Sequence, residues 1–132
     1  IAQAVLNLLD NAIKYSTEIK QISITVKTHK SNIMIEISDC GMGIPPKEQK
    51  KIFGKFYRVG NDLVHNVKGS GLGLALVKHI IEAHKGKITV KSTIGKGSCF
   101  TLSIPFKPLK TKQQSSKTQT GEVYNFVENT NH

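Results

Sequence analysis

Two asparagines one helical turn apart are the first residues in the chain whose types and spacing suggest chemistry. Asn7 and Asn11 belong to a run, residues 1–15, whose apolar side chains recur at helical spacing. At about 100° per residue the two amides stand roughly 40° apart on the polar side of the helix, near Lys14 and Tyr15. Amide oxygens in this arrangement can ligate a hard cation such as magnesium, and Lys14 could meet a phosphate. Taken alone, the pattern is more typical of an exposed polar helix face.

A glycine-containing turn, Asp39-Cys40-Gly41-Met42-Gly43, directly follows a strand-like run. Its glycines would let the backbone approach a ligand closely. An ionised Asp39 can only accept hydrogen bonds, which suits an exocyclic amine such as that of adenine. An Asx-type turn at a strand end explains the same residues, so this motif is weak by itself.

A second glycine-rich stretch, Gly69-Ser70-Gly71-Leu72-Gly73-Leu74, leads into a helix. Open backbone amides and a helix N-terminus favour anions, and Lys68 would add positive charge to a phosphate site. The stretch is not a Rossmann fingerprint, because no strand leads into it. It is not a P-loop either, because the Gly-Lys-Ser/Thr ending is absent. It predicts a phosphate contact only in combination with other motifs.

Three aromatic and two cationic residues are concentrated in Phe53-Gly54-Lys55-Phe56-Tyr57-Arg58. The aromatic side chains are more typical of core or hinge anchors than of a stacking platform. Arg58 stands at the start of a loop, residues 57–71, that lacks sustained periodicity and is long enough to be functional. Its guanidinium could reach a phosphate if that loop closes.

The elements that must position these residues follow from hydrophobic periodicity. Helices are predicted over residues 1–15, 47–52 and 72–84, the second after Pro45-Pro46 and the third ending at Gly86. Alternating apolar residues predict strands over 21–28, 33–38, 87–91 and 98–104, joined in pairs as hairpins. The first helix is predicted to carry Ala4 on its polar side and, on its apolar side, Val5, Leu6, Leu8, Leu9, Ala12 and Ile13. One sheet with helices packed on one face accommodates this order.

Composition indicates one folding unit, residues 1–106, followed by a flexible polar tail, residues 107–132. The 132-residue chain is long enough for one core but not comfortably for two, and the first part of the tail is poor in large apolar residues.

The net charge is +10, yet the lysines are spread along the chain, which favours solvated lysines over a polyanion-binding surface. Cys40 and Cys99 lack metal or redox spacing and are expected to be free thiols in a reducing compartment. No stretch is apolar enough to span a membrane.

In their order and spacing the four motifs resemble those of the ATP-binding catalytic domain of sensor histidine kinases. Residues 7–15 look like its N box, 39–43 like its first glycine box, 53–58 like its F box and 69–74 like its second glycine box. The wider group also contains type II topoisomerases, heat-shock chaperone ATPases and mismatch-repair ATPases. The resemblance covers residues 1–106. Each box is weak alone, but four in order are highly specific.

The resemblance implies an α/β (α+β) two-layer sandwich with a mixed, largely antiparallel sheet, helices on one face and an ATP lid at residues 57–71. Asn11 would hold Mg2+ with Asn7 assisting, and Lys14 and Arg58 would meet the phosphates of ATP. Asn7, Lys14 and Arg58 would form the catalytic set, and Asp39 would recognise adenine. Further ATP contacts are implied for Tyr15, Gly41, Gly43, Ile44, Phe53, Lys68, Gly69, Gly71, Leu72, Gly73 and Leu74.

The amide at position 7 separates two branches of this group. ATP-hydrolysing relatives commonly carry a glutamate there, and an amide cannot act as a general base. Asp10 is turned roughly 60° away around the helix and is not expected to replace that base. A protein-histidine kinase is therefore expected. The alternatives are an ATP-hydrolysing module of the chaperone or DNA-repair branch and a basic nucleic-acid-binding module.

The acceptor histidine is expected on a separate dimerisation segment, because none of the five histidines here has the setting of a phosphoacceptor. The phosphoryl group would then pass to the receiver domain of a response regulator, in a bacterial two-component system. Family domains begin with a strand and a helix before the N box, so the chain is expected to be an N-terminally truncated piece, inactive without the histidine segment. Its parent is expected to be a homodimer with this domain in the cytoplasm, which is compatible with an inner-membrane anchor. No nucleic-acid partner is expected.

Overall fold

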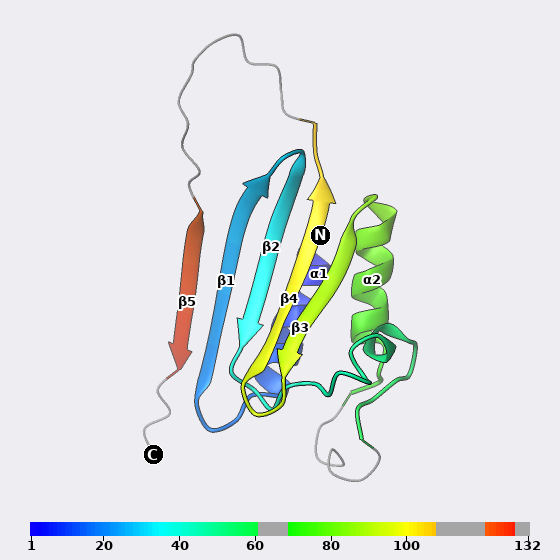
Figure 1. The fold of residues 1–132 in the computed structure, drawn as a ribbon. Helices are drawn as coiled ribbons and strands as arrows, with labels where there is room; N and C mark the ends of the chain where they lie inside the picture. The colour runs from blue at the N-terminus through cyan, green and yellow to red at the C-terminus, as the bar shows by residue number, and fades with distance from the viewer. Residues whose placement is uncertain (61–68, 108–120, 129–132) are drawn as a thin grey trace.

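The computed structural model describes residues 1–60, 69–107 and 121–128, which form two layers. A five-stranded sheet in the order β3-β4-β2-β1-β5 makes one layer, and two helices cover one of its faces (Figure 1). The helices are α1 (Ala2–Lys14) and α2 (Gly73–Ala83), with a 3-10 helix, η1 (Lys51–Phe53). The strands are β1 (Lys20–His29), β2 (Asn32–Asp39), β3 (Lys87–Thr93), β4 (Gly97–Pro105) and β5 (Glu122–Glu128). The predicted α/β sandwich is confirmed.

All four pairings between the described strands are antiparallel, where a mixed sheet was expected. The reason is that two hairpins, β1–β2 and β3–β4, meet side by side at the seam between β2 and β4. The face of the sheet that packs on the helices carries the buried side chains of Ile22, Ile37, Phe100 and Leu102. Each buried apolar side chain of this size contributes about 1.5–3 kcal/mol, so a register that turned them to solvent would be unfavourable.

Helix α1 buries a narrower stripe than its sequence predicts. Ala4, Leu8 and Ala12 are buried at helical spacing, where α1 packs against α2, β1 and β2. Ala4 is fully buried although it is predicted on the polar side, and Leu6 and Ile13 are 56% and 47% exposed although they are predicted on the apolar side. The prediction is wrong for these three residues because the two small alanines, at the same helical face as Leu8, let the neighbouring elements approach closely.

The segment predicted as a short helix over 47–52 forms tight turns followed by η1. The backbone N–H groups of Glu48 and Lys51 donate to the carbonyl oxygens of Pro45 and Glu48, each three residues back. This is the spacing of a 3-10 helix, so the predicted short helix is present only as turns followed by the 3-10 helix η1. The extended backbone of Gly54 ends the segment. In the loop that follows, Lys68 lies outside the described residues.

Strand β5 lies within the stretch predicted to be a flexible tail, so for residues 122–128 the structure differs from that prediction. It pairs antiparallel with β1 at the edge of the sheet, with Tyr124 opposite Ile24 (Figure 1). The segment contains Val123, Tyr124, Phe126 and Val127, which are residue types that favour strands, and the edge of β1 offers it unpaired backbone groups. The long polar run before the segment hides this short signal in the sequence.

Removing residues 108–132 is expected to leave the rest of the fold intact. The buried apolar residues of the described chain all lie between Ala4 and Leu102, whereas β5 pairs with β1 at an edge. The shortened chain should therefore unfold in one cooperative thermal transition at a somewhat lower temperature, with faster amide exchange along β1. Loss of cooperative unfolding would contradict a folding unit that ends near residue 106.

Candidate functional site

A cavity of about 200 Å³ opens near the end of the sheet where β2 ends and β4 begins. Its wall combines the last turns of α1, the turn after β2, the segment around η1, the start of α2 and the start of β4. Of the predicted site residues it contains Asn11, Lys14, Tyr15, Asp39, Gly43, Ile44, Arg58, Gly69, Gly71, Gly73 and Leu74. The structure therefore brings residues from all four sequence motifs to one cavity.

Among the predicted site residues that the structure describes, four do not line this cavity: Asn7, Gly41, Phe53 and Leu72. Asn7 instead joins α1 to the start of α2. Its Oδ1 accepts a hydrogen bond from Nε2 of Gln3 at 2.9 Å, and its Nδ2 lies 3.5 Å from the carbonyl oxygen of Gly73. Asn7 therefore stands one turn from Asn11, beside the cavity rather than in its wall.

The other three residues support the wall from neighbouring positions. A Cβ atom on Gly41 would lie 2.4 Å from the carbonyl oxygen of Tyr15, so a glycine is needed where the turn after β2 meets the end of α1. The ring of Phe53 packs edge-to-face on Phe100, with 6.4 Å between the ring centroids. Leu72 is the N-cap residue of α2 and its side chain is exposed.

Asp39 ends β2 and places a partly buried carboxylate in the wall of the cavity. Its Oδ1 accepts a hydrogen bond from the backbone N–H of Gly41 at 2.8 Å, and the backbone N–H of Ser98 donates to the same carboxylate. Burial raises the pKa of Asp39 above its ordinary value of 3.8, and the two amide hydrogen bonds offset part of that rise. When ionised, this carboxylate can accept a hydrogen bond from a ligand amine.

The turn after β2 is fixed by the hairpin of β3 and β4. Gly43 has a φ of +74°, and a Cβ there would lie 2.1 Å from the carbonyl oxygen of Thr93. The backbone N–H of Gly95 donates to the carbonyl oxygen of Met42 at 2.8 Å. Because Met42 and Gly43 both line the cavity, this close backbone packing sets the shape of its wall.

The segment after η1 and the second glycine turn are joined through their backbones. The N–H of Phe56 donates to the carbonyl oxygen of Gly71 at 3.0 Å, and a Cβ on Gly71 would lie 2.9 Å from the Cα of Phe56. Phe56 itself has a φ of +62°, which is rare for an aromatic residue, and its side chain is 71% exposed. A strained backbone and an exposed ring beside a cavity are typical of a functional segment.

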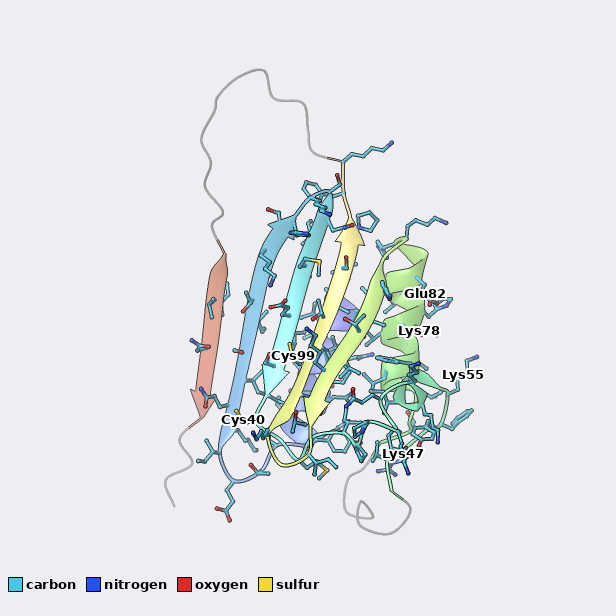
Figure 2. All side chains as sticks on the ribbon, viewed as in Figure 1. Cys40, Lys47, Lys55, Lys78, Glu82 and Cys99 are labelled. Carbon is cyan, nitrogen blue, oxygen red and sulfur yellow. The ribbon has the colours of Figure 1, made fainter. Side chains whose placement is uncertain are left out.

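The end of the molecule that contains the cavity is rich in positive charge. Lys14 and Arg58 line the cavity, and Lys47 and Lys55 lie around η1 near the start of α2 (Figure 2). The N-terminus of α2 adds the partial positive charge of its free backbone N–H groups. An anionic ligand is favoured at this end of the molecule.

Part of the cavity wall was not predicted from the sequence: Met42, Ile52, Tyr57, Val59, Ser70, Ser98 and Phe100. Ser98 and Phe100 share one face of β4 with Leu102, because alternate residues of a strand point the same way. This alternation is the signal that could have found them. The pairing of Ser98 opposite Asp39 was not readable from the sequence.

Cys40, which follows β2, and Cys99, in β4, are free thiols as predicted (Figure 2). None of the described helices is long and apolar enough to cross a membrane. The described residues contain no group of three or more His, Cys, Asp or Glu side chains arranged to hold a metal ion.

The chain matches a known protein family over most of its length. The family described as histidine kinase-, DNA gyrase B-, and HSP90-like ATPase matches residues 1–108. The chain belongs to this ATPase family. The four motifs and the cavity that they form therefore lie within the matched part of the ATPase domain.

This ATPase domain is similar in sequence to two sensor histidine kinases. It is 44% identical over 99 residues to RppB of Synechocystis, an alignment that covers 75% of the chain and 22% of RppB. It is 39% identical over 109 residues to WalK of Bacillus subtilis, which covers 81% of the chain and 18% of WalK. The chain thus spans about a fifth of the length of these relatives.

Solved structures of histidine kinases have the same fold as this ATPase domain. The mycobacterial sensor histidine kinase MprB matches with a TM-score of 0.69 and 32% identity, over 81% of this chain and 70% of that one. Full-length ShkA, solved in complex with AMPPNP, matches with a TM-score of 0.62 and 27% identity, over 79% of this chain and 21% of that one. The predicted relation to sensor histidine kinase catalytic domains is confirmed.

Proposed function

We propose that this chain is the ATP-binding catalytic domain of a two-component sensor histidine kinase. It would bind ATP and Mg2+ in the cavity and transfer the γ-phosphoryl group to a histidine on a separate dimerisation segment, for relay to a response regulator. One observation carries the proposal: the same cavity wall contains the carboxylate of Asp39, the cations Lys14 and Arg58, and the N-terminus of α2. The relatives RppB and WalK are sensor histidine kinases, which supports the same function.

The cavity offers different surfaces for the adenine ring and for the phosphates of a nucleotide. Its apolar lining includes Ile44, Ile52, Leu74 and Phe100. Together with the carboxylate of Asp39, these side chains would enclose adenine and accept a hydrogen bond from its amine. The glycines before α2, with Lys14 and Arg58, would contact the phosphates. The AMPPNP bound to ShkA supports a nucleotide ligand for this fold.

The donor set of the cavity fits a magnesium ion. Asn11 lines the cavity and carries a carboxamide oxygen, and magnesium takes few protein oxygens while keeping water and phosphate oxygens as ligands. Asn11 would hold the ion. Asn7, one turn earlier, would assist through a water molecule once its Oδ1 is released from Gln3. The bound ion would offset the negative charge of the phosphates.

Transfer to a histidine, rather than hydrolysis, fits the side chains around the cavity. Among the described residues that line it, Asp39 is the only carboxylate, and two backbone amides hold it. Asn7 cannot take a proton from water, and Asp10 is exposed on α1. Lys14 and Arg58 would position the phosphates and offset their charge, so the histidine could attack directly without a covalent intermediate on this domain.

An exposed apolar patch beside the cavity fits the partner segment. The exposed fractions of Phe56, Leu72 and Leu76 are 71%, 38% and 43%. Phe56 precedes the cavity-lining Tyr57, Leu72 follows the cavity-lining Gly71, and Leu76 lies one helical turn after Leu72. The histidine-bearing segment would dock here and present its histidine to the cavity. The parent would be a homodimer, and a response regulator receiver domain in the cytoplasm would accept the phosphoryl group.

Asn11→Ala is expected to abolish magnesium-dependent ATP binding. The ion should link the Asn11 oxygen to the phosphates, so the wild-type chain should bind ATP at least about tenfold more tightly with magnesium than with EDTA. The variant should lose this difference and keep its affinity in EDTA. Calorimetric titration in both buffers measures this difference in ATP affinity. Asn7→Ala is the matched control, and it is expected to reduce the difference less. Unchanged magnesium-dependent affinity in Asn11→Ala would remove this assignment of α1.

Phosphoryl transfer itself is tested by mixing the chain with γ-labelled ATP and a dimerisation segment that carries the acceptor histidine. The label should appear on the histidine segment, and replacing the acceptor histidine should prevent labelling. Steady ATP turnover without any histidine-bearing partner would instead support a hydrolase of the same fold.

A further inference from the structure

Four polar groups meet where the turn after β2 packs against the hairpin of β3 and β4. The hydroxyl oxygen of Ser92 lies 2.7 Å from the backbone nitrogen of Ile44, 2.9 Å from the carbonyl oxygen of Gly97 and 2.9 Å from the hydroxyl oxygen of Ser98. Ile44 and Ser98 line the cavity, whereas Ser92 does not. The Ser92 hydroxyl therefore lies directly behind the cavity wall and contacts it at two points.

The number of protons available fixes the direction of each of these hydrogen bonds. A backbone N–H can only donate and a carbonyl oxygen can only accept, while a hydroxyl has one proton and two lone pairs. Ser92 therefore accepts from Ile44 and donates its proton to Gly97. Because that proton is used, the remaining contact requires the hydroxyl of Ser98 to donate to Ser92.

The direction of the Ser98 hydroxyl decides what this part of the cavity presents to a ligand. Ser98 is buried opposite Asp39 in the pairing of β4 with β2, and its backbone N–H donates to the Asp39 carboxylate. With its hydroxyl proton directed at Ser92, the Ser98 oxygen can only accept from a ligand. The ionised Asp39 is also an acceptor. These two side chains together suit the edge of a ligand that carries hydrogen-bond donors.

We propose that Ser92 is a positioning residue that makes the cavity select 6-amino purine nucleotides over 6-oxo purine nucleotides. It acts through Ser98, and the inference rests on the nucleotide-binding function proposed above. A 6-amino group can donate to the acceptors of Asp39 and Ser98, directly or through water. A 6-oxo group would face them with a third acceptor, so that only the N1–H of the ring could still donate to one of them. Without the Ser92 oxygen, the Ser98 hydroxyl can rotate and donate to the 6-oxo group.

The backbone around Ser92 is held independently of its hydroxyl. The Nε2 of Gln49 donates to the carbonyl oxygens of Ile44 and Ser92, both at 3.0 Å. Ser92 also pairs opposite Ser98 in the ladder of β3 and β4. Removing the hydroxyl should therefore leave the turn and the hairpin in place, so that Ser92→Ala reports on the hydroxyl alone.

The test is the ratio of the dissociation constants for ITP and ATP, measured by calorimetry with magnesium on the 132-residue chain. The two nucleotides share their ribose and phosphates, so contacts to those groups cancel in the ratio. Wild type is expected to favour ATP, and Ser92→Ala should reduce that preference about tenfold, as expected for one redirected hydrogen bond. Ser92→Thr keeps a hydroxyl and should restore the preference. Ser103→Ala, farther along β4 and outside the cavity, is the matched control.

A double-mutant cycle tests whether Ser92 acts through Ser98. In that case Ser92→Ala should change the ratio in the wild-type background but not in the Ser98→Ala background. A ratio that stays unchanged in Ser92→Ala while ATP still binds would overturn this inference and leave the proposed function standing. A wild-type chain that binds neither nucleotide would overturn the proposed function, and this inference with it.

Discussion

Asp39→Asn is expected to remove most of the ATP affinity without unfolding the chain. Asparagine has nearly the same shape, and its Oδ1 can still accept the hydrogen bonds from the backbone of Gly41 and Ser98. The charge is lost, however, and a hydrogen bond to a charged group is worth about 1.5–3 kcal/mol. We therefore expect calorimetric titration to show an affinity reduced roughly 10- to 150-fold, with an unchanged circular dichroism spectrum.

The same substitution should not lower stability at neutral pH. Because the folded-state pKa of Asp39 is raised above 3.8, its protonated form stabilises the fold, and this contribution is complete below pH 3.8. The contribution is lost as the pH rises through the raised pKa. The free energy of unfolding of Asp39→Asn, relative to wild type, should therefore increase across this window and then stay level. A relative stability that falls with rising pH would contradict the dominant role of burial at this carboxylate.

Nucleotide binding by wild type should depend on pH with the opposite sign. The ionised form of Asp39 is the one that accepts a hydrogen bond from adenine, so affinity should fall as the pH drops through the raised pKa. Asp39→Asn should not show this component of the pH dependence, and the difference between the two titration series isolates it.

Gly43→Ala is expected to distort the cavity, and Gly95→Ala is its matched control. The two glycines have nearly the same φ, +74° and +77°, so alanine meets a similar backbone strain of about 1–2 kcal/mol at either position. At Gly43 the new Cβ would also lie 2.1 Å from the carbonyl oxygen of Thr93, whereas nothing lies within 4 Å of a Cβ at Gly95. The difference between the two variants therefore measures the close packing of the turn on the hairpin.

The contact at Gly43 can be relieved only by moving backbone. The turn would have to shift away from the hairpin, and Met42 and Ile44, which also line the cavity, would shift with it. We expect Gly43→Ala to lower the free energy of unfolding by about 1–3 kcal/mol more than Gly95→Ala in urea titrations. ATP affinity should fall by about tenfold or more in Gly43→Ala and remain near wild type in Gly95→Ala. Equal effects of the two variants would show that the turn does not depend on this packing.

The regular helices and strands could be predicted because the stretches with a helical or strand-like hydrophobic period are long and clear. Strand β2 was predicted over 33–38 and spans Asn32–Asp39, and α2 was predicted over 72–84 and spans Gly73–Ala83. The segment around η1 was too short for periodicity to separate α spacing from 3-10 spacing. Strand β5 was hidden because its apolar and polar residues do not alternate and a long polar run precedes it.

The residue types of the candidate site could be predicted from the sequence, but which of these residues lie close together in the fold could not. Asn7 and Asn11 both stand on the polar side of α1, yet Asn11 lines the cavity and Asn7 lies against the start of α2. Ser98 comes beside Asp39 through the register of β4 with β2, which no local pattern specifies. The direction of its hydroxyl depends on Ser92, on a third strand. Such contacts arise from tertiary packing, so residue spacing cannot reveal them.

The pairing of β5 with β1 also has a consequence for the order in which the chain assembles. Lys20 and Glu128 are paired although they lie roughly a hundred residues apart, whereas each hairpin joins strands that are close in the sequence. Closing the longer loop costs more entropy, so the hairpins should form first and β5 should dock last. During synthesis the edge of β1 stays open until residues 122–128 have been made. In that interval it can pair with a neighbouring nascent chain, so the speed of docking, rather than final stability, would set the yield of monomer.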